Sequence, residues 1–177
     1  MAQIVDLELY RRRARAQQGL KAWRNRFGWD FYSDTRLMDI PDRILISQAS
    51  PGLESTMAFY ELIMGLLGYP PGLTFEELGG RDQSQVLDIH LFMADNFRFE
   101  VMFRLGWLER FAGRRFTLLE MVLDFRKASR LSFGNPPALA SSHPGYGQYR
   151  RLVLLDRQVM IRKLIPKAIE AFQRRIE

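Results

Sequence analysis

One stretch of the chain, from about residue 83 to residue 111, limits the fold more than any other. Its large apolar side chains recur at spacings that cover almost every side of a helix, and Asp82 followed three residues later by Gln85 is typical of a helix N-terminus. A helix that is apolar all round is buried in a bundle or at a subunit interface. We therefore expect a long, very apolar central helix with other helices packed around it.

The rest of the sequence also indicates helices. Signals of the Thr-x-x-Glu type, which are typical of helix starts, stand at Thr74 and Thr117. No convincing alternation of apolar and polar residues predicts a strand. Five further helices are expected, at about residues 3–27, 34–50, 53–67, 118–130 and 149–177. We expect an all-α protein, a single bundle of five to six main helices.

Residues 131–148 interrupt the helical pattern over the longest distance. Glycine, proline and serine are frequent there, so we expect a long loop. This loop would divide the chain into a helical core over residues 1–130 and a C-terminal helical arm over residues 149–177, packed on the same core or on a partner subunit. Pro166 is expected to kink the arm or to restart its helix.

The absence of cysteine excludes several chemistries at once. A chain without thiols forms no disulfide, no cysteine-based zinc finger and no iron–sulfur cluster, and it has no thiol nucleophile. The most apolar run, Met57–Tyr69, contains Glu61 and is too short to span a bilayer. The first ten residues carry Asp6 and Glu8 and lack the apolar core of a signal peptide. We expect a cytoplasmic protein without a transmembrane segment.

Charge is distributed unevenly along the chain. The net charge is +6, yet residues 31–113 are acidic whereas both ends are basic, and most of the basic residues are arginine. Arginine favours bidentate contacts with phosphate or carboxylate. The candidate contacts for an anion or for nucleic acid are Arg11, Arg12, Arg15, Lys21, Arg150 and Arg151. The alternative is a solvated surface whose charge complements the acidic middle, in the same subunit or in its partner.

Three of the polar residues in the apolar helix share one stripe. Asn96, Glu100 and Arg104 are spaced by four, so they lie on one stripe, and Glu100 with Arg104 forms a favourable pair. Charges in such a position must be paired or must face a cavity. One interpretation is an ion pair that fixes the helix register. The other is a small polar pocket inside the bundle, joined by Glu61 and His90.

Neither histidine comes with the partners that metal binding or catalysis needs. His90 lacks the Glu-x-x-His spacing of metal sites in helical bundles. Nothing in the sequence orients His143 as a catalytic base. We expect no metal, no cofactor and no catalytic residue.

The sequence leaves three functional hypotheses, in a definite order. The first is a non-enzymatic helical interaction or assembly module, homodimeric, that binds another protein or itself, because large apolar residues are abundant and opposed charge blocks could orient subunits. The second is a nucleic-acid-binding protein in which the basic first helix and the basic C-terminal arm form one surface. The third is a small-ligand-binding or enzymatic bundle with a polar pocket near His90, Glu100 and Arg104.

Overall fold

The computed structural model describes residues 6–177, which form eight α-helices, three short 3₁₀ helices and one two-stranded sheet. The α-helices are α1 (Leu7–Phe27), α2 (Asp42–Ala49), α3 (Leu53–Leu67), α4 (Gly80–Arg104), α5 (Leu118–Leu123), α6 (Phe125–Gly134), α7 (Tyr146–Tyr149) and α8 (Leu154–Ile176). The 3₁₀ helices are η1 (Leu37–Asp39), η2 (Phe75–Glu77) and η3 (Ala112–Arg115). The expected all-α fold class is confirmed. Residues 3–5 of the first expected helix lie outside the described residues.

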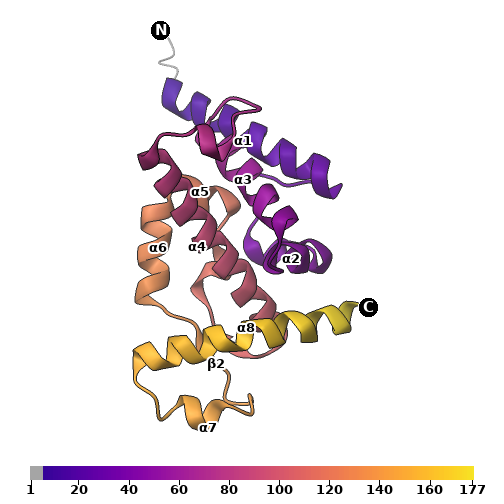
Figure 1. Ribbon diagram of the computed structural model, residues 1–177, viewed down its shortest axis with the longest axis vertical. Helices are drawn as coiled ribbons and strands as arrows, with labels where there is room; N and C mark the ends of the chain where they lie inside the picture. Colours follow the sequence, from indigo (N-terminus) through magenta and orange to yellow (C-terminus); the bar gives the residue numbers. More distant parts are fainter. Residues whose placement is uncertain (1–5) are drawn as a thin grey trace.

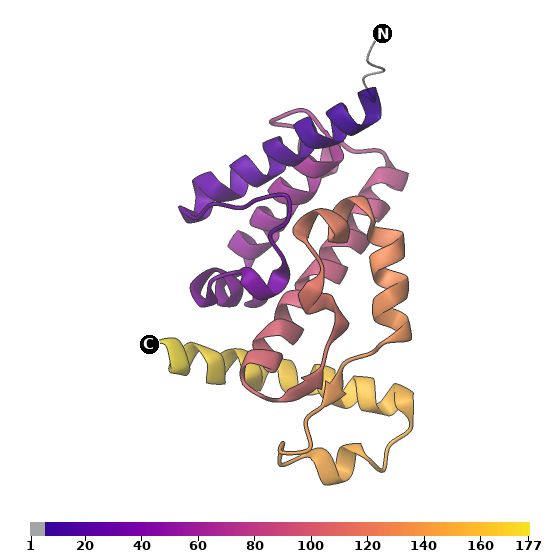
Figure 2. The same cartoon turned by 180° about the vertical axis from the view of Figure 1, so that it is seen from behind.

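The helices form an elongated bundle. α1 lies at one end of the long axis, α8 crosses near the other end, and α7 lies beyond it (Figures 1 and 2). α4 runs between these ends and contacts α2, α3, α5 and α8. α6 lies on one side of α4, whereas α1 and α2 lie on the other (Figure 1). The C-terminal helix packs on α2 and α4, and therefore on the same core as the rest of the chain.

An aromatic cluster around Trp23 joins three of the helices. The indole ring is fully buried, and its Nε1–H donates a hydrogen bond of 2.7 Å to the carbonyl oxygen of Ala58 on α3. The rings of Phe31, Phe59 and Phe97 surround it at centroid distances of 5.3–6.0 Å. Because a buried indole needs a partner for its N–H, this hydrogen bond also fixes how α1 lies on α3.

The long helix differs from the sequence-based prediction at both ends. It begins at Gly80 and ends at Arg104, because Gly106 takes a positive φ of 75° that turns the chain. Of the apolar residues that follow, Leu108 belongs to the strand β1 (Leu108–Arg110), which pairs antiparallel with β2 (Ala138–Leu139). Leu87 and Leu91 on α4 are also exposed, so this helix is not buried all round.

The segment expected as a loop contains regular structure. α6 continues to Gly134, β2 follows, and α7 begins at Tyr146, so residues 131–148 hold parts of three elements. The helix expected over residues 118–130 is two helices that meet at Asp124. α8 continues through Pro166 as one helix. No helix within residues 6–177 is both long and apolar enough to cross a membrane.

Candidate functional site

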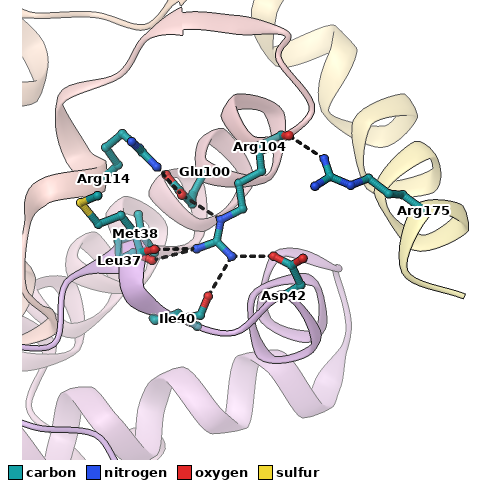
Figure 3. A network of polar contacts seen from close by, with 8 residues as sticks. All are labelled: Leu37, Met38, Ile40, Asp42, Glu100, Arg104, Arg114 and Arg175. Atoms are coloured by element: carbon teal, nitrogen blue, oxygen red, sulfur yellow. Dashed lines mark hydrogen bonds and ion pairs between the residues drawn. The ribbon is translucent and has the colours of Figure 1, made fainter.

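Glu100 and Arg104 lie in a packed ionic network at the C-terminal end of α4 (Figure 3). The Glu100 carboxylate is fully buried and accepts hydrogen bonds from Arg104 Nε at 2.9 Å and from two nitrogens of Arg114 at 3.2 Å. The Arg114 guanidinium also stacks over the Phe103 ring at 3.9 Å. We call this set of contacts the Glu100 network. It links α4 to η3.

Arg104 has no donor left for a ligand. Its Nη1 donates to the carbonyl of Ile40 at 2.8 Å and to Asp42 Oδ1 at 2.6 Å. Its Nη2 donates to the carbonyls of Leu37 and Met38 at 3.4 and 3.2 Å. With the Nε bond to Glu100, all five N–H groups of the guanidinium have an acceptor (Figure 3). These contacts tie η1 and α2 to α4, which supports the ion-pair interpretation of the stripe.

The other members of the expected polar pocket lie elsewhere. The Glu61 carboxylate pairs with the Arg26 guanidinium at 2.5 Å near the surface. The half-buried His90 ring lies beside the rings of Phe59 and Tyr60, and its Nδ1 is buried without a hydrogen-bond partner among the described residues. Burial, together with the nearby Arg98 charge, lowers the pKa of His90 below its usual value of 6.5. The structure therefore does not bring Glu61, His90 and Glu100 together.

Asn96 borders a different feature, a cavity of about 450 Å³ between α4, α6, η3 and the start of α8. We call it the α6–α8 cleft. Its apolar walls come from Phe92, Phe99, Phe111, Phe133, Pro136, Pro137, Leu154 and Leu155. Asn96 lies in the wall and donates its Nδ2–H to the carbonyl of Phe92 at 2.7 Å. The volume lies within the range of ligand pockets.

Large apolar side chains at this cleft are exposed to solvent. Phe133 at the end of α6 is 91% exposed, and Leu154 and Leu155 at the start of α8 are 62% and 75% exposed. Val153 and Val159, next to them along the chain, are also exposed. Contiguous exposed apolar surface is uncommon on monomeric proteins and marks interaction sites.

A few polar groups line the same cleft. Arg162 Nη1 pairs with Asp95 Oδ2 at 2.7 Å, which joins α8 to α4. Gln158 Nε2 donates to the carbonyl of Pro137 at 3.0 Å. The hydroxyl oxygen of Ser132 is buried and has no partner within the described part of the chain. The cleft thus combines apolar walls with a small number of polar groups, a combination typical of binding sites.

A second hollow runs along α1 and has a volume of about 790 Å³. Its floor is apolar, and the basic residues Arg12, Arg13, Lys21 and Arg24 line it together with the exposed Tyr32. We call it the α1 groove. Arg12 pairs with Asp124 at 2.7 Å and Arg24 lies 3.8 Å from Asp30, whereas Arg13 and Lys21 form no ion pair among residues 6–177.

The expected anion contacts do not form one surface. Arg12 and Lys21 line the α1 groove, whereas Arg11 does not line it and Arg15 lies against Gly68 at the end of α3. Arg150 and Arg151 follow α7, at the opposite end of the long axis (Figure 1). The basic first helix and this part of the C-terminal arm are therefore separated by the length of the molecule.

No group of three or more histidine or acidic side chains within residues 6–177 lies close enough together to hold a metal ion.

Comparisons with protein-family models, with curated proteins and with solved structures find no match to this chain. Any functional assignment therefore depends on the chemistry of the two surfaces.

Sequence reasoning singled out Asn96 but missed Phe133, Leu154 and Leu155. A signal for the last two was present, because Val153-Leu154-Leu155 are consecutive apolar residues at a helix start. Adjacent helical positions point about 100° apart, so three in a row cannot all face one core. Phe133 stood in the segment expected as a loop, where no helical face could be assigned to it.

Proposed function

We propose that this chain is a non-catalytic interaction module that binds an apolar segment of another protein in the α6–α8 cleft. The observation that carries the proposal is the exposure of Phe133, Leu154 and Leu155 around a cavity of about 450 Å³. Burying these side chains against a partner would remove apolar surface from water, the main favourable term in protein association. A hollow also gives a partner side chain a place to anchor.

The Glu100 network supports a binding role over a catalytic one. The only fully buried carboxylate accepts hydrogen bonds from two guanidinium groups, and every Arg104 donor is occupied, among the residues described. Charged groups in that state are occupied by contacts within the fold and are not available to a substrate. By contrast, the apolar cleft has open volume. The proposal therefore assigns stability to the network and recognition to the cleft.

Display of random peptides tests this proposal with a defined probe. A library of peptides of about 16 residues, roughly four helical turns, is selected on the wild-type protein. We expect enriched peptides whose affinity falls at least about tenfold for the double variant Phe133→Ser, Leu155→Ser, because the variant removes two anchor contacts. The matched control is Leu53→Ser, Met57→Ser, which removes two exposed apolar side chains from α3. Peptides that bind all three proteins equally would contradict the proposal.

A second candidate function is supported by the α1 groove. Four basic residues line it, no carboxylate does, and the exposed Tyr32 ring offers a stacking surface. Arg12 and Arg24 are twelve residues apart on one helix, a distance of about 18 Å. Cationic grooves with exposed aromatic rings are typical of proteins that bind single-stranded nucleic acid.

Anisotropy of a labelled single strand, measured at low and moderate salt, tests the second candidate. Binding through phosphate contacts should weaken steeply as salt rises. The variant Arg13→Glu, Lys21→Glu should abolish it, whereas Arg150→Glu, Arg151→Glu, at the other end of the molecule, should not. An equal loss in both variants would indicate non-specific attraction to a basic protein.

A further inference from the structure

The two helices that border the α6–α8 cleft are rich in cations. α6 carries Arg126, Lys127 and Arg130 and no carboxylate. The start of α8 and the residues before it add five cations, with Asp156 as the single carboxylate between residues 146 and 163. Arg162 pairs with Asp95, and Arg157 donates to the carbonyls of Tyr149 and Arg150. Of the cations in these segments, those with neither an ion pair nor a side-chain hydrogen bond among residues 6–177 are Arg126, Lys127, Arg130, Arg150, Arg151 and Lys163.

Helical spacing places these charges beside the exposed apolar groups. Arg126, Arg130 and Phe133 follow one another at intervals of four and three, so they share a face of α6. Leu155, Val159 and Lys163 are spaced by four on α8. Each helix therefore presents an apolar anchor contact and a cation on the same side. A complementary partner carries apolar residues flanked by carboxylates.

The same charge pattern disfavours a second copy of this chain as the occupant. In a two-fold symmetric dimer the same patch lies on both sides of the interface. The cations of α6 and of α8 would then be brought into one interface from both copies, and like charges across an interface are costly. The concave shape of the cleft also suits a protruding side chain better than a flat bilayer.

Resting on the proposed function, we infer that the occupant of the α6–α8 cleft is an acidic amphipathic helix of another protein. Its apolar residues, at spacings of three and four, enter the cleft, and its carboxylates lie along the cationic rim of α6 and α8. This is the helix-in-groove mode of peptide recognition. The cations steer the partner and fix its orientation, while the apolar anchors supply most of the affinity.

The peptides enriched on the wild-type protein test this inference through their charge. We expect a net negative charge, apolar residues at helical spacing, and affinity that falls as salt screens the rim. The variant Arg126→Glu, Arg130→Glu should weaken these peptides about tenfold or more, whereas Arg11→Glu, Arg15→Glu on α1 should not. A new selection on the α6 variant should enrich basic peptides instead.

Two kinds of failure are distinguishable. If the enriched peptides are neutral or basic but still require Phe133 and Leu155, the inference of an acidic partner is wrong and the proposed function stands. If no peptide requires these two residues, the inference and the proposed function are both wrong. Sedimentation with phosphatidylcholine vesicles containing phosphatidylserine, and light scattering over a range of protein concentration, test the other occupants. Vesicle binding or dimerisation that is lost in the variant Phe133→Ser, Leu155→Ser would overturn the inference in favour of a membrane or of a second copy.

Discussion

The Glu100 network and the α6–α8 cleft share one stripe of α4, but the network is buried and fully paired, whereas the cleft is open and mostly apolar. Asn96, Glu100 and Arg104 follow one another at intervals of four residues. Asn96 lies in the wall of a cavity of about 450 Å³. Glu100, one turn further on, is fully buried and accepts three hydrogen bonds from two arginines. The position of a polar residue on a helix face therefore does not decide its role; the elements that cover the face do.

Under the proposed function, this difference separates the residues that stabilise the fold from the residues that bind a partner. η1, α2 and η3 cover the C-terminal end of the stripe and supply carbonyl and guanidinium partners. At the level of Asn96 the covering elements α6 and α8 leave space, and their exposed side chains are apolar. Substitutions in the network should therefore alter the free energy of unfolding, and substitutions in the cleft should alter binding.

The largest effect is expected for Glu100→Gln. The amide keeps the shape of the side chain but leaves the Arg104 and Arg114 guanidinium groups without their shared anion. Arg104 keeps its pair with Asp42, so the charge left without a carboxylate is that of Arg114. Breaking a buried pair in this way costs up to about 3–5 kcal/mol. Urea unfolding of the two proteins measures the difference in the free energy of unfolding.

The matched control is Glu170→Gln, which alters the exposed pair of Glu170 with Arg174 on α8. Exposed pairs contribute about 0–1 kcal/mol, so this variant should unfold close to the wild type. Similar losses in the two variants would remove the distinction between the network and an ordinary surface ion pair.

An intermediate effect is expected at Gly113, which lies between the two regions. It lines the cleft and precedes Arg114 of the network. A Cβ atom here would lie 1.8 Å from Asn96 Oδ1 and 2.6 Å from the Phe111 ring, so Gly113→Ala forces these neighbours to move. Overpacking of this kind costs about 1–3 kcal/mol.

Gly134→Ala at the end of α6 is the control for this substitution, because no atom lies within 4 Å of the added Cβ. Its free energy of unfolding should change by less than about 0.5 kcal/mol. Thermal unfolding of both variants compares their free energies of unfolding. If Gly113→Ala were as stable as Gly134→Ala, the wall of the cleft would be pliable and not a fixed surface.

A smaller effect on stability is expected for Phe133→Ser, Leu155→Ser, the variant that should weaken peptide binding at least about tenfold. These side chains are 91% and 75% exposed, so their removal takes little apolar surface out of the core. The free energy of unfolding should change by less than about 0.5 kcal/mol at each site. A loss of several kcal/mol in urea unfolding would show that the two side chains belong to the core, and the comparison with the network would fail.

Local signals allowed part of this fold to be predicted from the sequence. The boundaries of α3 match the expected helix, and both Thr-x-x-Glu signals form capping boxes in the structure. At Thr117, the hydroxyl accepts from the Glu120 N–H at 3.1 Å and the Glu120 carboxylate accepts from the Thr117 N–H at 2.8 Å. All of these contacts lie within one turn of helix, where the spacing of the residues along the sequence determines which groups are in contact.

The remaining features depend on contacts between distant segments. The strand after α4 was hidden because its partner, Ala138–Leu139, lies about thirty residues further along the chain. The cleft was hidden for the same reason, since Phe133 and Leu155 come from different helices. For Glu100 the sequence offered two interpretations. Only the position of Arg114, fourteen residues away, distinguishes a packed network from an open pocket.

The smallest effect concerns His90, a polar group on α4 that belongs to neither region. Burial lowers its pKa, and its Nδ1 has no hydrogen-bond partner within residues 6–177. Below about pH 6.5 the unfolded chain therefore binds a proton that the folded chain resists, so acid destabilises the fold until the pH reaches the lowered pKa of His90. His90→Gln cannot titrate and should lose less stability than the wild type between pH 7 and pH 5. Urea unfolding across this range compares the two, and the lowered pKa of His143 cancels because both proteins retain that residue. Parallel stability curves would mean that the pKa of His90 is the same in the folded and in the unfolded chain, and would contradict the prediction.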